Sequence, residues 1–379
     1  MKWVVLVRRW LSVALAVGIV WLGVPVSADT PPQISSLSAV VYEPQSGTVL
    51  YEKAGDIPRP MASTTKLMTA LLASERLDAE STVTVPELAL PVEGSQIGLA
   101  VGDTITVRDL LAGLLLASGN DTANVLALSM ADSLPAFAVL MNKRAAALGM
   151  THTTFVTPSG LDGGDHSASA RDMALLGAAV LKQPLLAQLC AAKTASLTVS
   201  GKKMTVKNHN KLLTLTDGCI GLKTGFTKKA GRCLVSAVQR DGITLIVATL
   251  NGGDYWNDHL ALYDYGFSLV ERQPLSAQLP VTIPVAGGVT SGVAVTCTLP
   301  QDAVMMIGEK ITSVVELPSF VWAPVAVGDA LGCITFYAGE RQLARVPVTA
   351  KQRVDSRPVP TGFARWWRHV VQMFKELIR

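Results

Sequence analysis

Three short polar motifs follow one another along the chain and together contain the groups that nucleophilic catalysis needs. An S-x-x-K motif joins Ser63 to Lys66, an S-x-N motif joins Ser118 to Asn120, and a K-T-G motif spans Lys223–Gly225. They supply a hydroxyl nucleophile, an amine base, a proton relay and a cation. A single S-x-x-K match means little, but the ordered set of three predicts a catalytic site.

The S-x-x-K motif sits where a helix is expected to begin. Pro60 precedes Met61–Ala73, which is rich in Ala, Leu, Met and Lys, so Ser63 falls in the first turn of a predicted helix. Residues three apart share a helix face, so the Lys66 amine can reach the Ser63 hydroxyl and remove its proton. Burial beside a second cation, Lys223, favours the neutral form of Lys66 that a base requires. The helix N-terminus also stabilises an anion near Ser63.

The sequence contains a second S-x-x-K match in a different predicted structure. Ser200–Lys203 fits the pattern but lies within Thr198–Val206, where Gly between β-prone residues predicts a hairpin. We therefore expect the functional pair to be the first one.

The S-x-N motif follows the apolar run Leu110–Ala117 and precedes a second helical pattern, which predicts a loop between two helices. A Ser118 hydroxyl both donates and accepts, so it can pass a proton. The Asn120 amide can hold a substrate carbonyl while donating to the lysine network. Taken alone, the same triplet is also a common helix cap.

The K-T-G motif fits a strand that lines a cleft. Lys223 can attract a substrate carboxylate, Thr224 can hydrogen-bond it, and Gly225 lets the substrate backbone approach closely. Taken alone, the tripeptide is also consistent with a Lys and a Thr on a solvated strand that has no function in binding.

The three motifs and their surroundings resemble the low-molecular-mass penicillin-binding proteins, the bacterial D-alanyl-D-alanine carboxypeptidases. The similarity extends from about residue 36 to the end of the chain and is densest in four segments. These are Pro60–Thr69, Thr157–Asp162, Ser169–Asp172 and Asp217–Gly231.

The resemblance implies a mechanism for these residues. Ser63 attacks the carbonyl of the penultimate D-alanine, and Lys66 accepts its proton. Ser118 and Lys223 relay the proton to the leaving amine, and the backbone N–H groups of Ser63 and Phe226 hold the oxyanion. It further implies peptidoglycan stem peptides ending in D-Ala-D-Ala as substrate, β-lactams as covalent inhibitors, and no cofactor or metal.

One feature of several relatives is missing. They carry an Arg beyond the strand after K-T-G that helps to fix the substrate carboxylate, whereas Asn251–Trp256 contains none. On this reading Lys223 and Thr224 bind the carboxylate alone.

The N-terminus carries the pattern of an export signal. Lys2, Arg8 and Arg9 precede the apolar stretch Trp10–Val24, and Val26–Ala28 ends in small residues, so residues 1–28 are expected to be a cleaved signal peptide. A retained membrane helix is the alternative. The 379-residue chain has 33 Lys and Arg against 29 Asp and Glu, a balance that gives no indication of nucleic-acid binding.

Residues 351–379 form a second targeting pattern. A linker with Pro358 and Pro360 leads into apolar residues spaced three and four apart, which predicts an amphipathic helix lying in a membrane interface. Its apolar residues are Phe363, Trp366, Trp367, Val370, Val371, Phe374, Leu377 and Ile378, and its basic ones are Arg365, Arg368, Lys375 and Arg379. The segment is too short and too charged to span a bilayer. It predicts an exported protein held at the outer face of the cytoplasmic membrane, although a helix packed on the protein is the alternative.

Between these ends the pattern predicts an α+β catalytic domain over residues 29–272 and an all-β sandwich over 273–350. The resemblance implies a β-lactamase/transpeptidase-like catalytic domain, an antiparallel sheet with a helical cluster. Strands are expected over Ala39–Tyr42, Thr48–Tyr51, Arg232–Val238 and Ile243–Leu250, and helices over Val107–Leu116, Asn120–Ala131, Ala136–Leu148 and Ala168–Leu181.

The five histidines and five cysteines show no metal-ligand spacing. Among the histidines, His166 is the one expected nearest a cleft. Among the cysteines, Cys297 and Cys333 are the one disulfide pairing the sequence suggests, because both fall in the all-β region.

Two other functions share parts of this pattern. A β-lactamase uses the same acylation groups but needs a placed carboxylate for fast release, and Ser159–His166 offers Asp162 and Asp165 but no evident Glu. A non-catalytic wall-peptide-binding protein has no need of the complete set of nucleophilic groups.

Overall fold

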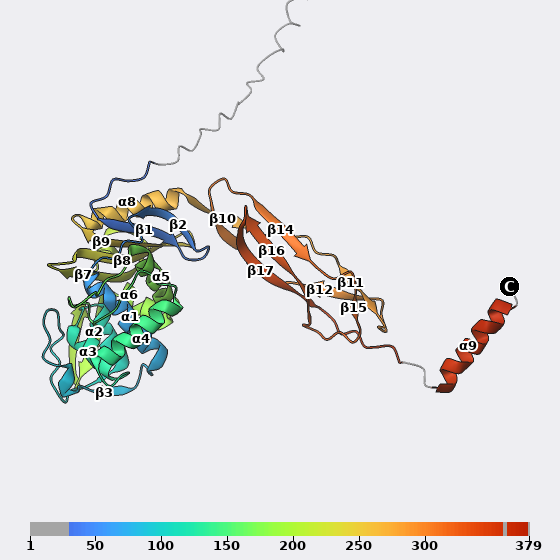
Figure 1. Ribbon diagram of the computed structural model, residues 1–379, viewed down its shortest axis with the longest axis horizontal. Coiled ribbons are helices and arrows are strands. Elements are labelled where there is room, and N and C mark those ends of the chain that lie inside the picture. Colours follow the sequence, from blue (N-terminus) through green and yellow to red (C-terminus); the bar gives the residue numbers. More distant parts are fainter. Residues whose placement is uncertain (1–29, 359–361, 378–379) are drawn as a thin grey trace, which may run out of the picture. The chain divides into compact units, whose positions relative to one another are not determined.

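A five-stranded antiparallel sheet brings the two ends of the catalytic region together. The computed structural model describes residues 30–358 and 362–377, so the predicted signal peptide lies outside the described residues. The strand order is β2-β1-β9-β8-β7 (Figure 1). The strands are β1 (Ser38–Glu43), β2 (Thr48–Lys53), β7 (Cys219–Thr227), β8 (Gly231–Arg240) and β9 (Ile243–Gly252). Because helices separate these strands in sequence, the α+β prediction is confirmed.

The central strands are apolar on both faces because both faces are covered. Along β8, Val235 and Ala237 pack into the helical core, whereas Leu234 and Val238 pack toward α8 (Tyr255–Ser268). Successive side chains of a strand point to opposite faces, so this alternation divides one strand between two cores.

The predicted helices form close to their expected bounds. They are α2 (Val107–Leu115), α3 (Asn120–Leu128), α4 (Leu134–Ala147) and α5 (Ala170–Leu181), joined by α1 (Lys66–Arg76), α6 (Pro184–Ala191), α7 (Leu212–Leu215) and the 3-10 turn η2 (Glu87–Ala89). The predicted hairpin also forms, from β5 (Thr194–Val199) and β6 (Lys202–Lys207), which extend the small sheet of β3 (Thr82–Thr84) and β4 (Thr104–Thr106). The second S-x-x-K match is therefore the turn of this hairpin.

The helix predicted over Met61–Ala73 differs at its start. Residues Ala62–Thr65 form a 3-10 turn, η1, and the α-helix begins only at Lys66. The hydroxyls of Thr64 and Thr65 donate to the carbonyls of Met61 and Ala62, at 2.6 and 2.8 Å. These bonds compete with α-helical ones and favour the tighter turn.

Between α8 and residue 350 the secondary structure is all strands. β10 (Val270–Pro274), which crosses the expected boundary at residues 272 and 273, pairs with β13 (Asp302–Met306). The other strands form a sheet in the order β14-β16-β17-β12-β11-β15. Their bounds are Thr282–Ala286 for β11, Gly292–Thr296 for β12, Ile311–Glu316 for β14, Val321–Trp322 for β15, Ala330–Ala338 for β16 and Arg341–Ala350 for β17. Ala303 of β13 shares a buried cluster with Ile334 and Val348, so the two sheets face each other.

The disulfide suggested between Cys297 and Cys333 is wrong, since both are free thiols. Cys297 lies just past β12, whereas Cys333 lies within β16, and β17 separates these two strands. Strands two places apart are about 10 Å from each other, beyond the Cα separation that a disulfide spans. The Cys333 thiol instead lies 3.0 Å from the Glu316 carboxylate.

The amphipathic helix forms as α9 (Gly362–Leu377), and none of its residues is buried. Within residues 30–358 and 362–377 no single helix is long and apolar enough to cross a membrane, although the bent pair α5 and α6 meets that length and composition together.

A buried carboxylate ties the chain ahead of β1 to the first turn of α8. Asp258 is 5% exposed and accepts from the backbone N–H and hydroxyl groups of both Ser35 and Ser36, at 2.5 to 2.8 Å. Burial raises the pKa of Asp258, but these hydrogen bonds together outweigh it and hold the pKa below its ordinary value of 3.8.

We predict that Asp258→Asn destabilises the protein by about 1.5–3 kcal/mol at pH 7, the range for hydrogen bonds to a charged group. Because the folded-state pKa is depressed, this contribution is present above the unfolded pKa and is lost as pH falls through the folded value. Urea denaturation of parent and variant should therefore show a gap at pH 7 that closes below about pH 4. Asp264→Asn, on the exposed face of the same helix, is the matched control and should change stability by less than about 0.5 kcal/mol; an equal loss in both variants would contradict this account.

Candidate active site

Strand β7 runs directly against the turn that carries Ser63. A Cβ atom placed on Gly225 would lie 2.9 Å from the backbone nitrogen of Ser63 and 3.0 Å from the carbonyl oxygen of Met61. The glycine of K-T-G is therefore required by the approach of the protein's own backbone. It brings the S-x-x-K and K-T-G motifs, 160 residues apart, into contact.

The Lys66 amine is buried and surrounded by three oxygen atoms. Its Nζ lies 2.8 Å from Ser63 Oγ, 2.6 Å from Asn120 Oδ1 and 2.7 Å from the carbonyl oxygen of Ser159. The amide and carbonyl oxygens can only accept, so they take the two N–H bonds of a neutral amine. The lone pair then faces the Ser63 hydroxyl, which is the arrangement a general base needs.

Electrostatics favour that neutral form. Burial lowers the pKa of Lys66 well below its ordinary value, the positive charge of Lys223 lowers it further, and Asp121 opposes both. Burial also lowers the pKa of Lys223, to about 7. The second amine expected opposite Lys66 is thus present, 1% exposed, and its Nζ donates to the carbonyl of Thr224 at 3.0 Å.

Asn120 is oriented differently from the expectation. Its Oδ1 accepts from Lys66, and its Nδ2 donates to the backbone carbonyl of Glu93. The amide therefore accepts from the lysine network where donation was expected, because a backbone acceptor on the facing loop holds its NH₂ group. The next residue, Asp121, anchors that loop by accepting from the N–H groups of residues 97–99 at 2.9 to 3.2 Å.

Ser118 occupies the predicted loop between α2 and α3, in a left-handed conformation with φ of 63°. Its side chain has no hydrogen bond to Lys66 or Lys223 within the described part of the chain. It is 5% exposed and lines the cavity beside Ser63.

The carbonyl of Ser159 is a contact that motif reasoning missed. The Thr157–Asp162 segment was visible as a family resemblance, but a backbone oxygen leaves no signal in side-chain type. Gly160, with φ of 87°, holds this loop against the nucleophile turn, since a Cβ there would lie 2.0 Å from the carbonyl oxygen of Ala62.

His166 lies behind the turn and does not line the cavity. Its Nδ1 accepts from the backbone N–H of Val156 at 2.9 Å, so the proton is on Nε2, which donates to Thr65 Oγ1 at 2.8 Å. Burial lowers the pKa of His166 to about 4. The histidine expected nearest the cleft is thus a neutral positioning group for the Ser63 turn.

A cavity of about 250 Å³ opens over Ser63. Its lining residues are Ser63, Ser95, Ser118, His209, Thr224, Gly225, Phe226, Arg232 and Tyr255. The predicted residues Lys66, Asn120 and Lys223 are buried around it. Sequence reasoning missed Ser95, His209, Arg232 and Tyr255, because none belongs to a motif.

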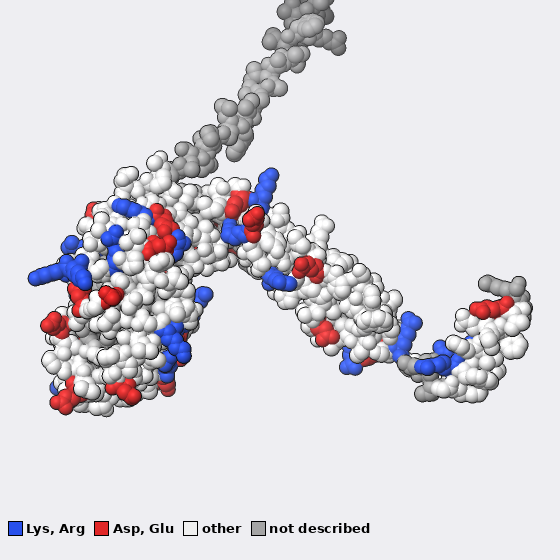
Figure 2. Space-filling view, viewed as in Figure 1, with Lys and Arg blue, Asp and Glu red and all other residues white. Residues whose placement is uncertain are grey.

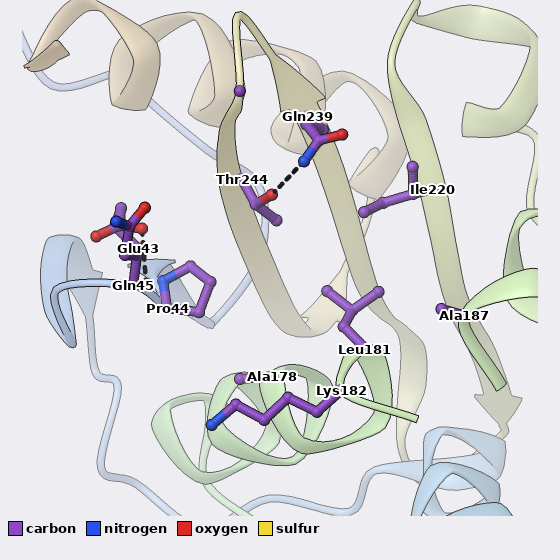
Figure 3. Close-up of a pocket in the computed structure, with 11 residues that line it drawn as sticks. Glu43, Pro44, Gln45, Ala178, Leu181, Lys182, Ala187, Ile220, Gln239 and Thr244 are labelled. Carbon is purple, nitrogen blue, oxygen red and sulfur yellow. Dashed lines mark hydrogen bonds between the residues drawn. The ribbon is translucent and has the colours of Figure 1, made fainter. Parts of the chain in front are cut away.

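A larger pocket of about 360 Å³ contains none of the predicted site residues (Figure 3). Leu181 and Ile220 supply apolar surface to it, and Gln239 donates to Thr244 at 3.2 Å within it (Figure 3). Size alone therefore does not identify the site of chemistry.

Comparisons with known proteins identify the family of this chain. The family model for D-alanyl-D-alanine carboxypeptidases, Peptidase_S11, matches residues 25–253. The D-alanyl-D-alanine carboxypeptidase DacF of Bacillus subtilis is 32% identical over 330 residues, which cover 83% of this chain and 85% of that protein. The crystal structure of the D-alanyl-D-alanine carboxypeptidase DacD from Francisella tularensis is 25% identical with a TM-score of 0.62, covering 86% of this chain and 95% of that one. The Streptomyces K15 DD-transpeptidase is 32% identical with a TM-score of 0.60, covering 63% and 100%.

The ordered motifs and a family match over more than half of the residues lead to one conclusion: this chain belongs to the D-alanyl-D-alanine carboxypeptidase family of serine peptidases.

Proposed function

We propose that the enzyme removes the terminal D-alanine from peptidoglycan stem peptides through an acyl-enzyme on Ser63. The observation that carries this assignment is the Lys66 amine, 2.8 Å from Ser63 Oγ with both N–H bonds directed to other acceptors. β-lactams acylate the same hydroxyl.

In the acylation step, Ser63 Oγ attacks the carbonyl of the penultimate D-alanine while its proton passes to Lys66. The backbone N–H groups of Ser63 and Phe226 stabilise the oxyanion, and the close packing of Gly225 on the Ser63 turn supports their convergence. Ser118 and Lys223 deliver a proton to the departing amine, the C–N bond breaks, and free D-alanine leaves. Water then hydrolyses the ester.

The site favours a penicillin-binding protein, which releases a β-lactam acyl group slowly, over a β-lactamase, which releases it fast. In residues 30–358 and 362–377 no carboxylate is hydrogen-bonded to Ser63 or Lys66. The loop beside them contributes the carbonyl of Ser159, and the Asp162 carboxylate accepts from the Thr227 hydroxyl at 3.3 Å. A non-catalytic binding protein has no use for a buried neutral amine at this position.

We predict that Lys66→Arg lowers the rate of acylation by a labelled penicillin about 10²–10⁴-fold, the range for loss of a general base, because arginine stays protonated. Ser63→Ala should abolish labelling altogether. In the parent enzyme the rate should fall as pH is lowered through the depressed pKa of Lys66, because protonation removes the lone pair that accepts the Ser63 proton. Rates are read from stopped labelling reactions and D-alanine release from a D-Ala-D-Ala peptide.

The second S-x-x-K match provides the control for these variants. Ser200→Ala removes the hydroxyl of the other match. This hydroxyl lies on an exposed hairpin, accepts from the Thr104 N–H and donates to Asp103. The variant should leave the rates of penicillin labelling and D-alanine release unchanged. Normal labelling of Ser63→Ala would place the nucleophile elsewhere.

We also propose that the protein is exported by residues 1–28 and held at the outer face of the cytoplasmic membrane by α9. The helix exposes large apolar side chains, among them Phe363 at 76%, Trp366 at 57% and Trp367 at 54%. The rings of these three residues lie 5.8 to 6.4 Å apart. Blue Lys and Arg atoms lie beside a broad uncharged surface on this helix (Figure 2). That combination suits an interface of anionic lipid headgroups.

We predict that Trp366→Ala with Trp367→Ala weakens binding of the full chain to vesicles of anionic lipid by about tenfold or more, because two indole rings leave the interface. Co-sedimentation measures this, and penicillin labelling should not change. Trp322→Ala, at a residue 72% exposed on β15, is the matched control. Equal binding by both variants would contradict the anchor.

A further inference from the structure

Arg232 places a guanidinium at the cavity over Ser63. It lies near the start of β8, directly opposite Phe226 of β7 and Gly252 of β9. Residues directly opposite each other on paired strands point to the same face, so Arg232 shares the face of Phe226 and of Thr224, two residues earlier on β7. Both Arg232 and Thr224 line the cavity.

Two aromatic rings flank this guanidinium. Its central carbon lies 5.8 Å from the centre of the Phe226 ring and 6.0 Å from that of Tyr255. Burial raises the pKa of Tyr255, and the positive charge of Arg232 opposes the rise. Within the described ranges Arg232 forms no ion pair with a carboxylate, so its charge is held in place but not neutralised.

The other cationic candidates are less suited to bind an anion in this cavity. Lys223 is 1% exposed and does not line it. His209 does line it, but burial lowers its pKa and the charge of Lys223 lowers it further, which favours the neutral ring. Arg232 is the lining residue whose charge is permanent.

We propose that Arg232, together with the Thr224 hydroxyl, binds the terminal carboxylate of the peptide substrate. Arg232 lines the same cavity as Thr224, and a guanidinium offers the paired N–H donors that a carboxylate accepts. The contact selects peptides with a free C-terminus. The proposal rests on the proposed carboxypeptidase function and adds the residue that determines this specificity.

A pair of thioester substrates isolates the contact. In one, the leaving group carries a carboxylate; in the other, that carboxylate is a methyl ester. The activated thioester bond keeps acylation measurable without the anion. We expect Arg232→Gln to lower kcat/KM for the carboxylate substrate about 10- to 100-fold, as for loss of a charge-assisted hydrogen bond, and for the methyl ester less than about threefold. Arg232→Lys should fall between Arg232→Gln and the parent on the carboxylate substrate.

Arg240→Gln is the matched control, since Arg240 ends the same strand, stacks on Phe267 at 4.9 Å and lies outside the cavity. It should change neither rate. Equal losses of kcat/KM on both thioesters for Arg232→Gln would show that Arg232 only supports the structure of the cleft. An unchanged kcat/KM for the carboxylate substrate would show that Lys223 and Thr224 bind the carboxylate without Arg232. Either result overturns the proposal. A parent enzyme that turns over neither thioester and releases no D-alanine from a D-Ala-D-Ala peptide would instead overturn the proposed function itself.

Discussion

The catalytic region is built around one buried lysine amine. Packing keeps this amine from water, and each of its hydrogen-bonding positions has a partner. Removing the ammonium from water is costly, and burial therefore shifts Lys66 toward its neutral form. That shift requires a dry environment, which α1, α2, α3 and α5 provide together with sheet residues in one shared apolar core. The large apolar core is thus also the source of the chemistry.

Two residues at the site have unusual backbone conformations. Ala62 and Ser118 both have positive φ, at 48° and 63°, although neither is glycine. Such conformations cost about 1–3 kcal/mol each and persist where the surroundings over-determine them. Here Gly160 packs on the Ala62 carbonyl, and His166 holds Thr65 from behind. These conformations occur where the hydroxyls of Ser63, the proposed nucleophile, and Ser118 both line the cavity.

The charges around the cleft divide into two groups by depth. The two amines to which we assign proton transfer, Lys66 and Lys223, are buried, and desolvation lowers the pKa of each. The guanidinium of Arg232 lies at the exposed rim of the cavity and forms no ion pair with a carboxylate of residues 30–358 or 362–377. A positive charge near Lys66 disfavours its protonated form, so a cation at the rim can attract an anionic substrate without opposing a neutral base beside Ser63.

The sequence by itself determined whatever depends on neighbours a few residues apart. The spacing of Ser63 and Lys66, the hairpin around Ser200 and the helices between the outer strands could all be predicted, since 3.6-residue and two-residue periodicities are local. Tertiary structure alone decided that the Ser159 carbonyl contacts Lys66 and that Asn120 accepts a hydrogen bond where it was expected to donate one. It also decided that β17 separates Cys297 from Cys333. The position of Arg232 at the cavity likewise follows from the tertiary structure. These outcomes depend on which strands and loops become neighbours. Long-range packing of the apolar faces sets that arrangement, and it produces no periodic pattern in the sequence.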